Sequence, residues 1–298
     1  MPASADRPYF AYGSNLDAQD WQRFCAEHGF DDAHDGLNPL GPAWLGDWEL
    51  SFTYRSLRRD AGALTINPAL GRCVSGALFA VSQAGWRALD AKEGAGQRYD
   101  RMETIVVDAS GREILALTYR TRPELRLETP IPPSRGYLEA VCRGRRAVGH
   151  DTAAAERAGR GEPSGDPGAV FVYGTLQPGE CNFPALAPVI EASQAQPALL
   201  LGGGRLVDLG SYPGLVDLGR EDAHPVRGTL LPLTDAPGAV RAMDPIEVFQ
   251  GYGVADNLYR RVLVRVRTED GAERLAWSYL YLQDISAARP ISTGMWTC

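Results

Sequence analysis

The sequence predicts an α+β protein made of two similar halves in tandem. The first observation is a repeated segment: Tyr9-Phe-Ala-Tyr-Gly-Ser-Asn-Leu16 returns as Val170-Phe-Val-Tyr-Gly-Thr-Leu176. The second is a later pattern, Val74-Ser-Gly-Ala-Leu-Phe79, which returns as Val226-Arg-Gly-Thr-Leu-Leu231. Because both patterns occur in the same order, a repeated structural unit explains them better than chance.

The chain length and a polar interval between the halves predict two domains. At 298 residues the chain can bury two separate cores. Residues 150–168 contain no large aliphatic side chain, and no aromatic one after His150. We therefore expect domains at 1–149 and 169–298, joined by a linker at 150–168 that has no apolar residue able to dock.

Composition excludes several classes of protein. A net charge of -7 and a pI near 5.2 argue against a nucleic-acid partner. The five cysteines are scattered and include no Cys-x-x-Cys, which is typical of cytosolic thiols. No run approaches the roughly 20 apolar residues of a membrane helix, and Met1–Pro8 lacks the apolar core of a signal peptide. We expect a soluble, cytoplasmic protein with no membrane partner; its oligomeric state stays open.

Hydrophobic periodicity places the elements of the first half. The expected strands are 8–12, 44–54, 62–67, 73–81, 102–108 and 113–119, and the expected helices are 17–28, a segment from the N-cap Ser82 to about Gly94, and 135–148. Three arginines of the last helix, Arg143, Arg145 and Arg146, are interpreted as a solvated face.

The second half gives a similar series. The expected strands are 169–173, 198–209, 212–217, 226–233, 259–267 and 274–282, with a helix at 235–247. Gly202-Gly203-Gly204 is interpreted as a turn or bulge, because Val207 occupies the place of the third glycine of a dinucleotide loop. The four histidines never occur at metal-ligand spacing, so no metal site is expected.

Each half also has a carboxylate at the end of a helix. Leu89-Asp-Ala-Lys-Glu93 corresponds to Met243-Asp-Pro-Ile-Glu247. A Tyr-x-Arg pattern opens the next strand in both halves, at Tyr99–Arg101 and Tyr259–Arg261. Considered alone, each glutamate would be interpreted as a solvated surface charge, and Asp90 and Asp244 as groups that bond nearby backbone.

The repeated Tyr-Gly segments predict two anion-binding loops. A strand that stops at Tyr-Gly leaves backbone N–H groups without strand partners, and glycine allows a ligand to approach closely. The N–H groups concerned are those of Gly13, Ser14 and Asn15, and of Gly174, Thr175 and Leu176. Such a nest holds a carboxylate or a developing oxyanion.

Taken as an ordered set, these motifs resemble the gamma-glutamylcyclotransferase family. The first half is similar to gamma-glutamylcyclotransferases in its Tyr-Gly-Ser-Asn-Leu, Gly62-Ala-Leu-Thr and Pro133-Ser134-x-x-Tyr137 motifs. The second half is similar to the gamma-glutamylamine cyclotransferase branch in Ser211-Tyr-Pro-Gly-Leu and Ile291-Ser-Thr-Gly-Met-Trp296. The resemblance implies a small mixed β-barrel with flanking helices in each half. Strand patterns alone do not predict that the barrel closes.

The resemblance also implies a reaction and its residues. The α-amine of a gamma-glutamyl compound attacks the γ-carbonyl, and 5-oxoproline and a free amine are released; one carboxylate can move the protons, and no cofactor is needed. By resemblance, the catalytic residues are Glu93 and Glu247. The expected substrate-binding residues are Tyr12, Gly13, Ser14, Asn15, Leu16, Tyr99, Tyr173, Gly174, Thr175, Leu176 and Tyr259. The tyrosines are expected to act as packing and hydroxyl anchors, not as proton donors.

The second half departs from the family pattern. Pro245 interrupts its helix, Val248 stands where the family tends to have glycine, and Met295 replaces an expected acidic residue. The loop 248–258 is interpreted as a candidate substrate lid. Two hypotheses stay open: a bifunctional cyclotransferase, or a chain in which one half, more readily the second, is a non-catalytic module that binds a glutamyl ligand or a partner. The leaving amine is not specified by the sequence.

Overall fold

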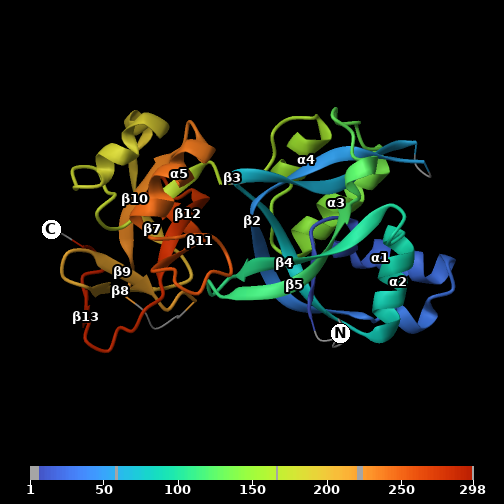
Figure 1. Ribbon diagram of the computed structural model, residues 1–298, viewed down its shortest axis with the longest axis horizontal. Coiled ribbons are helices and arrows are strands. Elements are labelled where there is room, and N and C mark those ends of the chain that lie inside the picture. Colours follow the sequence, from blue (N-terminus) through green and yellow to red (C-terminus); the bar gives the residue numbers. More distant parts are fainter. Residues whose placement is uncertain (1–6, 58–59, 166, 220–223, 297–298) are drawn as a thin grey trace. The chain divides into compact units, whose positions relative to one another are not determined.

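Two short apolar segments, Tyr9–Ala11 (β1) and Ala169–Val172 (β6), each form one strand of a separate closed β-barrel in the computed structural model (Figure 1). The structure describes residues 7–57, 60–165, 167–219 and 224–296. The chain divides into two compact units, Met1–Asp108 with Ile114–Gly165, and Ala109–Glu113 with Asp166–Cys298. The expected α+β class with two tandem barrels is confirmed.

The first barrel has the strand order β1-β3-β2-β4-β5. Besides β1, its strands are Leu37–Ser56 (β2), Ala61–Val81 (β3), Tyr99–Asp108 (β4) and Glu113–Thr121 (β5). Its helices are Ala18–Glu27 (α1), Gln83–Glu93 (α2), Arg135–Ala147 (α3) and Ala153–Gly159 (α4), with 3₁₀ turns at Ser14–Leu16, Asp31–Ala33 and Pro123–Leu125.

The second barrel contains β6, Gln196–Leu200 (β7), Arg227–Pro232 (β10), Tyr259–Thr268 (β11) and Glu273–Tyr281 (β12). A small sheet of order β13-β8-β9 adds Arg205–Asp208 (β8), Pro213–Val216 (β9) and Arg289–Pro290 (β13). The remaining elements are the helix Ala236–Ile246 (α5) and 3₁₀ turns at Phe183–Ala185, Ala187–Val189 and Ala192–Gln194.

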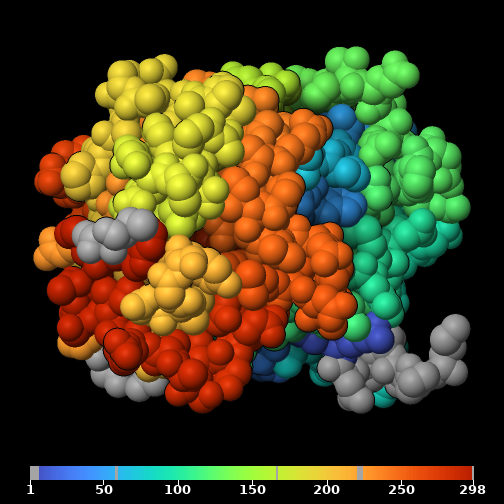
Figure 2. Space-filling view, turned by 60° about the vertical axis from the view of Figure 1, so that its left-hand side comes forward, coloured from blue at the N-terminus to red at the C-terminus, as the bar shows by residue number. Residues whose placement is uncertain are grey.

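These 3₁₀ turns lie against the segment that leads into α5. In Figure 2 the turns are yellow and the α5 segment is orange, and the backbone N–H of Thr234 donates to the carbonyl of Val189 at 2.9 Å. Asp235 caps α5 by accepting a hydrogen bond from the N–H of Gly238.

The two barrels have the same circular strand order, since β6-β10-β7-β11-β12 matches β1-β3-β2-β4-β5. In both, the first strand pairs antiparallel with the strand that contains the Val-x-Gly pattern. The glycine of that pattern is required by packing: a Cβ on Gly76 would lie 2.2 Å from the carbonyl oxygen of Ala11, and one on Gly228 would lie 2.3 Å from that of Val172. The sequence repeat is therefore a repeat of one barrel.

The predicted strands differ from the observed ones where the chain bends. The expected strands 62–67 and 73–81 form one continuous strand, β3, and 44–54 is extended to 37–56 in β2, with register shifts that include Gly46/Trp48. Conversely, the expected strand 198–209 is divided into β7 and β8. Gly202 and Gly203, both with positive φ, form the predicted turn between them.

The expected linker is wrong for its first part, because residues 153–159 form α4. Three of its alanines, Ala154, Ala155 and Ala158, are buried in the core with Phe52 and Val141. Small side chains can dock where a helix lies close to a barrel, so the lack of large apolar residues did not indicate an exposed segment.

The interpretation of the α3 arginines as a solvated face is wrong for Arg145. Its side chain is only 1% exposed, and it donates to the carbonyl and hydroxyl of Ser75 and to the carbonyl of Asp151. Arg143 is exposed and pairs with Asp17 at 2.7 Å, and Arg146 is exposed. Arg145 thus fixes α3 and the segment after it to strand β3.

Several local predictions are confirmed. Ser82 caps α2 through the N–H of Gly85, and Gly94 follows the helix in the left-handed conformation. Within the described ranges, Cys25, Cys73, Cys142 and Cys181 form no disulfide; Cys298 and most of Met1–Pro8 lie outside the described residues. No helix in the described ranges is long and apolar enough to cross a membrane.

Candidate active site

The first barrel has a cavity of about 610 Å³ beside the end of α2. Glu93 lines it together with Ser14 and Tyr99. The other lining residues include aromatic and charged side chains that the sequence interpretation did not select: Asp20, Arg23, Phe24, Tyr54, Lys92, Arg98 and Tyr137. Lys92 is held at 2.8 Å from Asp20, so this charge pair forms part of the wall.

Asn15 joins the Tyr-Gly loop to Glu93. Its Nδ2 donates to the Glu93 carboxylate and to the hydroxyl of Tyr9, both at 2.8 Å. Asn15 is itself buried, with only 5% of its surface exposed. A hydrogen bond from a buried donor restricts the carboxylate to a few orientations, which suits a group that has to meet a substrate proton.

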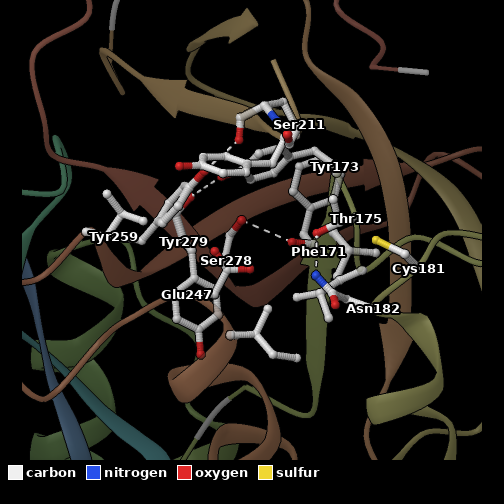
Figure 3. Close-up of a pocket in the computed structure, with 17 residues that line it drawn as sticks. Phe171, Tyr173, Thr175, Cys181, Asn182, Ser211, Glu247, Tyr259, Ser278 and Tyr279 are labelled. Carbon is white, nitrogen blue, oxygen red and sulfur yellow. Dashed lines mark hydrogen bonds between the residues drawn. The ribbon is translucent and has the colours of Figure 1, made fainter. Parts of the chain in front are cut away.

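The second barrel has a smaller cavity, of about 170 Å³, at the end of α5 (Figure 3). In that view Glu247 and Tyr259 lie on one side of the cavity, and Thr175, Cys181 and Asn182 lie on the other. Asn182 fixes the loop, because its Nδ2 donates to the Thr175 hydroxyl at 3.0 Å and its backbone N–H donates to the Thr175 carbonyl at 3.0 Å.

Glu247 has an unusual electrostatic environment. Burial, and secondarily the nearby Asp244 carboxylate, raise the pKa of Glu247 to about 8. A carboxyl group with such a pKa can accept and return a proton near neutral pH, which an exposed glutamate does poorly.

The tyrosines act as anchors, as expected. Tyr12 and Tyr173 donate to the carbonyls of Tyr119 and Tyr279, each at 2.6 Å. Tyr99 and Tyr259 donate to the carbonyls of Leu64 and Pro213, at 2.9 and 2.7 Å. Burial raises the pKa of all four hydroxyl groups well above the usual value, so none is suited to donate a proton.

The loop residues differ in how they reach the cavities. In the second barrel Tyr173, Gly174, Thr175 and Leu176 all line the cavity. In the first barrel, Ser14 lines the cavity, whereas Tyr12, Gly13, Asn15 and Leu16 do not. No described acceptor bonds the backbone N–H of Ser14 or of Thr175. That these N–H groups bind an anion stays a prediction.

The interpretation of Asp90 and Asp244 as groups that bond nearby backbone is wrong. Asp90 accepts from Arg101 Nε at 2.8 Å, from Arg101 Nη2 at 2.6 Å and from the Tyr119 hydroxyl at 2.7 Å. Asp244 likewise pairs with Arg261 at 3.0 Å and with Tyr279 at 2.6 Å. The repeated Tyr-x-Arg spacing indicated the arginines, but nothing local to the sequence indicated Tyr119 and Tyr279.

The loop 248–258 does not resemble a lid in this structure. Its last residue, Leu258, lines the cavity, but Phe249 is buried and packs with Tyr252 and Arg261. Asn257 ties the loop together by accepting from Gln250 and donating to Gly251. The aromatic residues of the loop therefore support Arg261 instead of covering a ligand.

Comparison with known proteins gives the same relationship in both halves. Residues 170–298 match the family model described as gamma-glutamyl cyclotransferase, AIG2-like, and residues 73–152 match the model described as AIG2-like family. Together the two ranges span more than half of the chain. A comparison with curated proteins gave no match.

Solved structures are similar at low identity. One titled gamma-glutamyl cyclotransferase is 25% identical, with a TM-score of 0.43, over 53% of this chain and 89% of its own. An uncharacterized protein from Homo sapiens is 26% identical, with a TM-score of 0.43, over 54% and 91% of the two chains. YkqA from Bacillus subtilis is 16% identical, with a TM-score of 0.37, over 93% and 84%.

Proposed function

Because the chain consists of two tandem domains of the AIG2-like gamma-glutamyl cyclotransferase family, we propose that both domains are cyclotransferases that release 5-oxoproline from small gamma-glutamyl compounds. The observation that carries the proposal is that Glu93 lines a cavity with Ser14 of its Tyr-Gly loop, and Glu247 lines one with residues 173–176 of its own loop. Such a cavity brings a proton acceptor and an anion-binding loop to the same ligand.

The proposed reaction needs few groups. The substrate's α-ammonium gives a proton to the glutamate, and the free amine then attacks the γ-carbonyl carbon. The new C–N bond closes a five-membered lactam, the loop N–H groups stabilise the oxyanion, and the glutamic acid returns the proton to the departing nitrogen as the old C–N bond breaks. The second proton of the attacking nitrogen then passes to the released amine, which leaves as an ammonium ion. Holding amine and carbonyl together supplies up to roughly 7 to 11 kcal/mol, so no covalent enzyme intermediate is required.

The two cavities support different substrates for the two domains. The cavity of about 610 Å³ has Arg23 and Arg98 in its wall, whereas the cavity of about 170 Å³ is lined mainly by aromatic and aliphatic side chains. We therefore propose two activities in one chain, at work in the cytoplasm, with the larger leaving amine accepted by the first domain. The alternative, a non-catalytic second domain, receives less support because the raised pKa of Glu247 suits proton transfer.

The first test replaces each glutamate in the full chain. Glutamine keeps the shape of glutamate but cannot carry the proton, so Glu93→Gln and Glu247→Gln should each lower 5-oxoproline release from one class of substrate by about 10²- to 10⁴-fold. Mass spectrometry of reactions with gamma-glutamyl amino acids and gamma-glutamyl amines provides the measurement.

The control is Glu139→Gln, which replaces a half-exposed glutamate of α3 that pairs with Arg135 and should leave both rates unchanged. A double variant, Glu93→Gln with Glu247→Gln, that keeps more than about a tenth of the wild-type rate would contradict the proposal. Loss of every rate with Glu93→Gln alone would favour the non-catalytic second domain.

A further inference from the structure

A hydrogen-bonded network begins one helical turn before each catalytic glutamate. Asp90 precedes Glu93 by three residues, and Asp244 precedes Glu247 by three. Each aspartate accepts hydrogen bonds from an arginine on the following strand and from a tyrosine hydroxyl on the strand after that. Side chains three residues apart lie on the same face of a helix, so an aspartate that is held fixed also restrains the glutamate.

The backbone carbonyls of the same tyrosines accept hydrogen bonds from the tyrosines of the Tyr-Gly loops. The hydroxyl of Tyr279 donates to Asp244, and its carbonyl accepts from Tyr173. Tyr119 makes the corresponding two bonds, to Asp90 and from Tyr12. One residue in each barrel therefore connects the helix that carries the glutamate to the residue that precedes the loop glycine.

Both halves keep the aspartate, arginine and tyrosine of this network, although the residues around it differ. The glutamate is followed by its strand tyrosine after 6 residues in the first half and after 12 in the second, and Pro245 lies only in the second helix. The aromatic rings that stack on the arginine also differ: Trp86 lies 4.4 Å from the Arg101 guanidinium, and Trp277 lies 5.1 Å from that of Arg261. Arg261 is completely buried, and burying a charge is costly unless its partners are well placed.

We propose that Asp90, Arg101 and Tyr119, and likewise Asp244, Arg261 and Tyr279, are positioning residues that hold each catalytic glutamate at a fixed place relative to the N–H groups of its loop. The inference rests on the proposed function and extends it to residues that do not transfer protons themselves. It also makes Asp244 part of the electrostatic environment of Glu247.

The charged and titratable groups around Glu247 come from every element packed against it. They are Asp244 on α5, Tyr173 after β6, Tyr259 on β11 and Tyr279 on β12, and Asp244 in turn pairs with Arg261 on β11. Since the negative charge of Asp244 favours the protonated form of Glu247, replacing Asp244 by asparagine should lower the pH at which Glu247 loses its proton.

The kinetic experiment uses the full chain with one domain silenced. In a Glu93→Gln background, Tyr279→Phe should lower kcat of the second domain at least tenfold and leave KM within about twofold. The matched control is Tyr281→Phe, which removes a hydroxyl two residues farther along the same strand and should leave both constants within twofold. Tyr119→Phe in a Glu247→Gln background tests the first domain in the same way. A wild-type kcat in both phenylalanine variants, or a change confined to KM, would overturn the inference.

A second measurement does not depend on turnover. In protein carrying ¹³C-labelled glutamate, the carboxyl signal of Glu247 is assigned by its loss in Glu247→Gln and is titrated against pH. Asp244→Asn should move the midpoint down by roughly one pH unit or more, and an unchanged midpoint would overturn the inference. Should Asp244→Asn not fold, Tyr279→Phe is titrated instead, and its midpoint should differ from that of the wild type. If the chain forms no 5-oxoproline, the proposed function is wrong but the inference is still tested. The titration then shows whether Asp244 acts on Glu247.

Discussion

At the scale of single residues, the two glutamates have different immediate partners. Glu93 receives a hydrogen bond from Asn15, which is held by Tyr9. The second loop is one residue shorter, and Val170 takes the place of Tyr9. Within the described ranges no hydrogen bond reaches the Glu247 carboxylate, which leaves burial and Asp244 to set its pKa. The repeat thus conserves the glutamate but not the group that orients it directly.

This difference predicts a pH-dependent stability that belongs to Glu247. Its folded pKa, about 8, lies above the value near 4.5 of an exposed glutamate, so the folded state binds a proton more tightly than the unfolded state. The stability of the wild type relative to Glu247→Gln should therefore be greatest below about pH 4.5, decrease as the pH rises to about 8, and then level off. Each pKa unit corresponds to about 1.4 kcal/mol, which limits the change to several kcal/mol.

Urea unfolding of both proteins between pH 5 and pH 9 measures this difference. Glu139→Gln, at the exposed pair with Arg135, is unfolded in parallel as the control for the loss of a surface carboxylate. A constant difference between the wild type and Glu247→Gln would mean that the carboxyl group is not desolvated in the folded protein.

At the scale of elements, the residues that follow α2 and α5 show how the second half accommodates a valine where the family tends to have glycine. Gly94, which follows Glu93, has φ +63°, and Val248, which follows Glu247, has φ +50°. Glycine adopts this left-handed conformation without strain, whereas a β-branched residue pays roughly 1–2 kcal/mol. Val248 thus shares the positive φ of Gly94, although Glu93 is the last residue of α2 and Glu247 is the residue that follows α5.

We expect Val248→Gly to stabilise the second domain, because it removes this strain at a position whose side chain is partly exposed. The gain should be at most about 1 kcal/mol, since glycine also increases the entropy of the unfolded chain. The control, Val254→Gly, changes another exposed valine of the same loop that lacks positive φ, and should destabilise the protein. Thermal unfolding of both variants gives the comparison, and a lower midpoint for Val248→Gly would contradict the expectation.

Most elements could be predicted from local signals, but their extent could not. Caps such as Ser82 and turns such as Gly202-Gly203 follow from side-chain chemistry and backbone freedom, and both are confirmed. The continuity of β2 and β3 depends on pairing between strands, because turn-like residues such as Pro68 and Asn67 pair within the ladder. Likewise, the partners of Asp90 and Asp244 lie on strands far along the chain, and periodicity carries no information about them.

At the scale of the whole molecule, two barrels with one circular strand order account for the tandem repeat. Each barrel is closed by a parallel pairing, Tyr9 with Leu117 and Val170 with Trp277, between strands separated by about a hundred residues. Strand patterns cannot predict such a pairing, which is why closure rested on the family resemblance. The buried Arg145 and the docked helix α4 were missed for the same reason, since burial of a polar or small residue depends on distant partners.

The docked helix changes where the first domain should end. We propose that the two domains fold independently, and we expect a fragment of residues 1–165 to be more stable than one of residues 1–149. The shorter fragment loses the burial of Ala154, Ala155 and Ala158, about 2 kcal/mol in all, and leaves Arg145 without the Asp151 carbonyl. Thermal unfolding followed by circular dichroism should give a cooperative transition for 1–165 at a midpoint several degrees higher than that of 1–149.

The control is Ala155→Asp in the longer fragment, which places a charge in the core and should remove most of that gain in stability. Equal midpoints for the two fragments would show that α4 does not contribute to the first core, whereas a fragment of residues 168–298 without a cooperative transition would contradict the independence of the second domain.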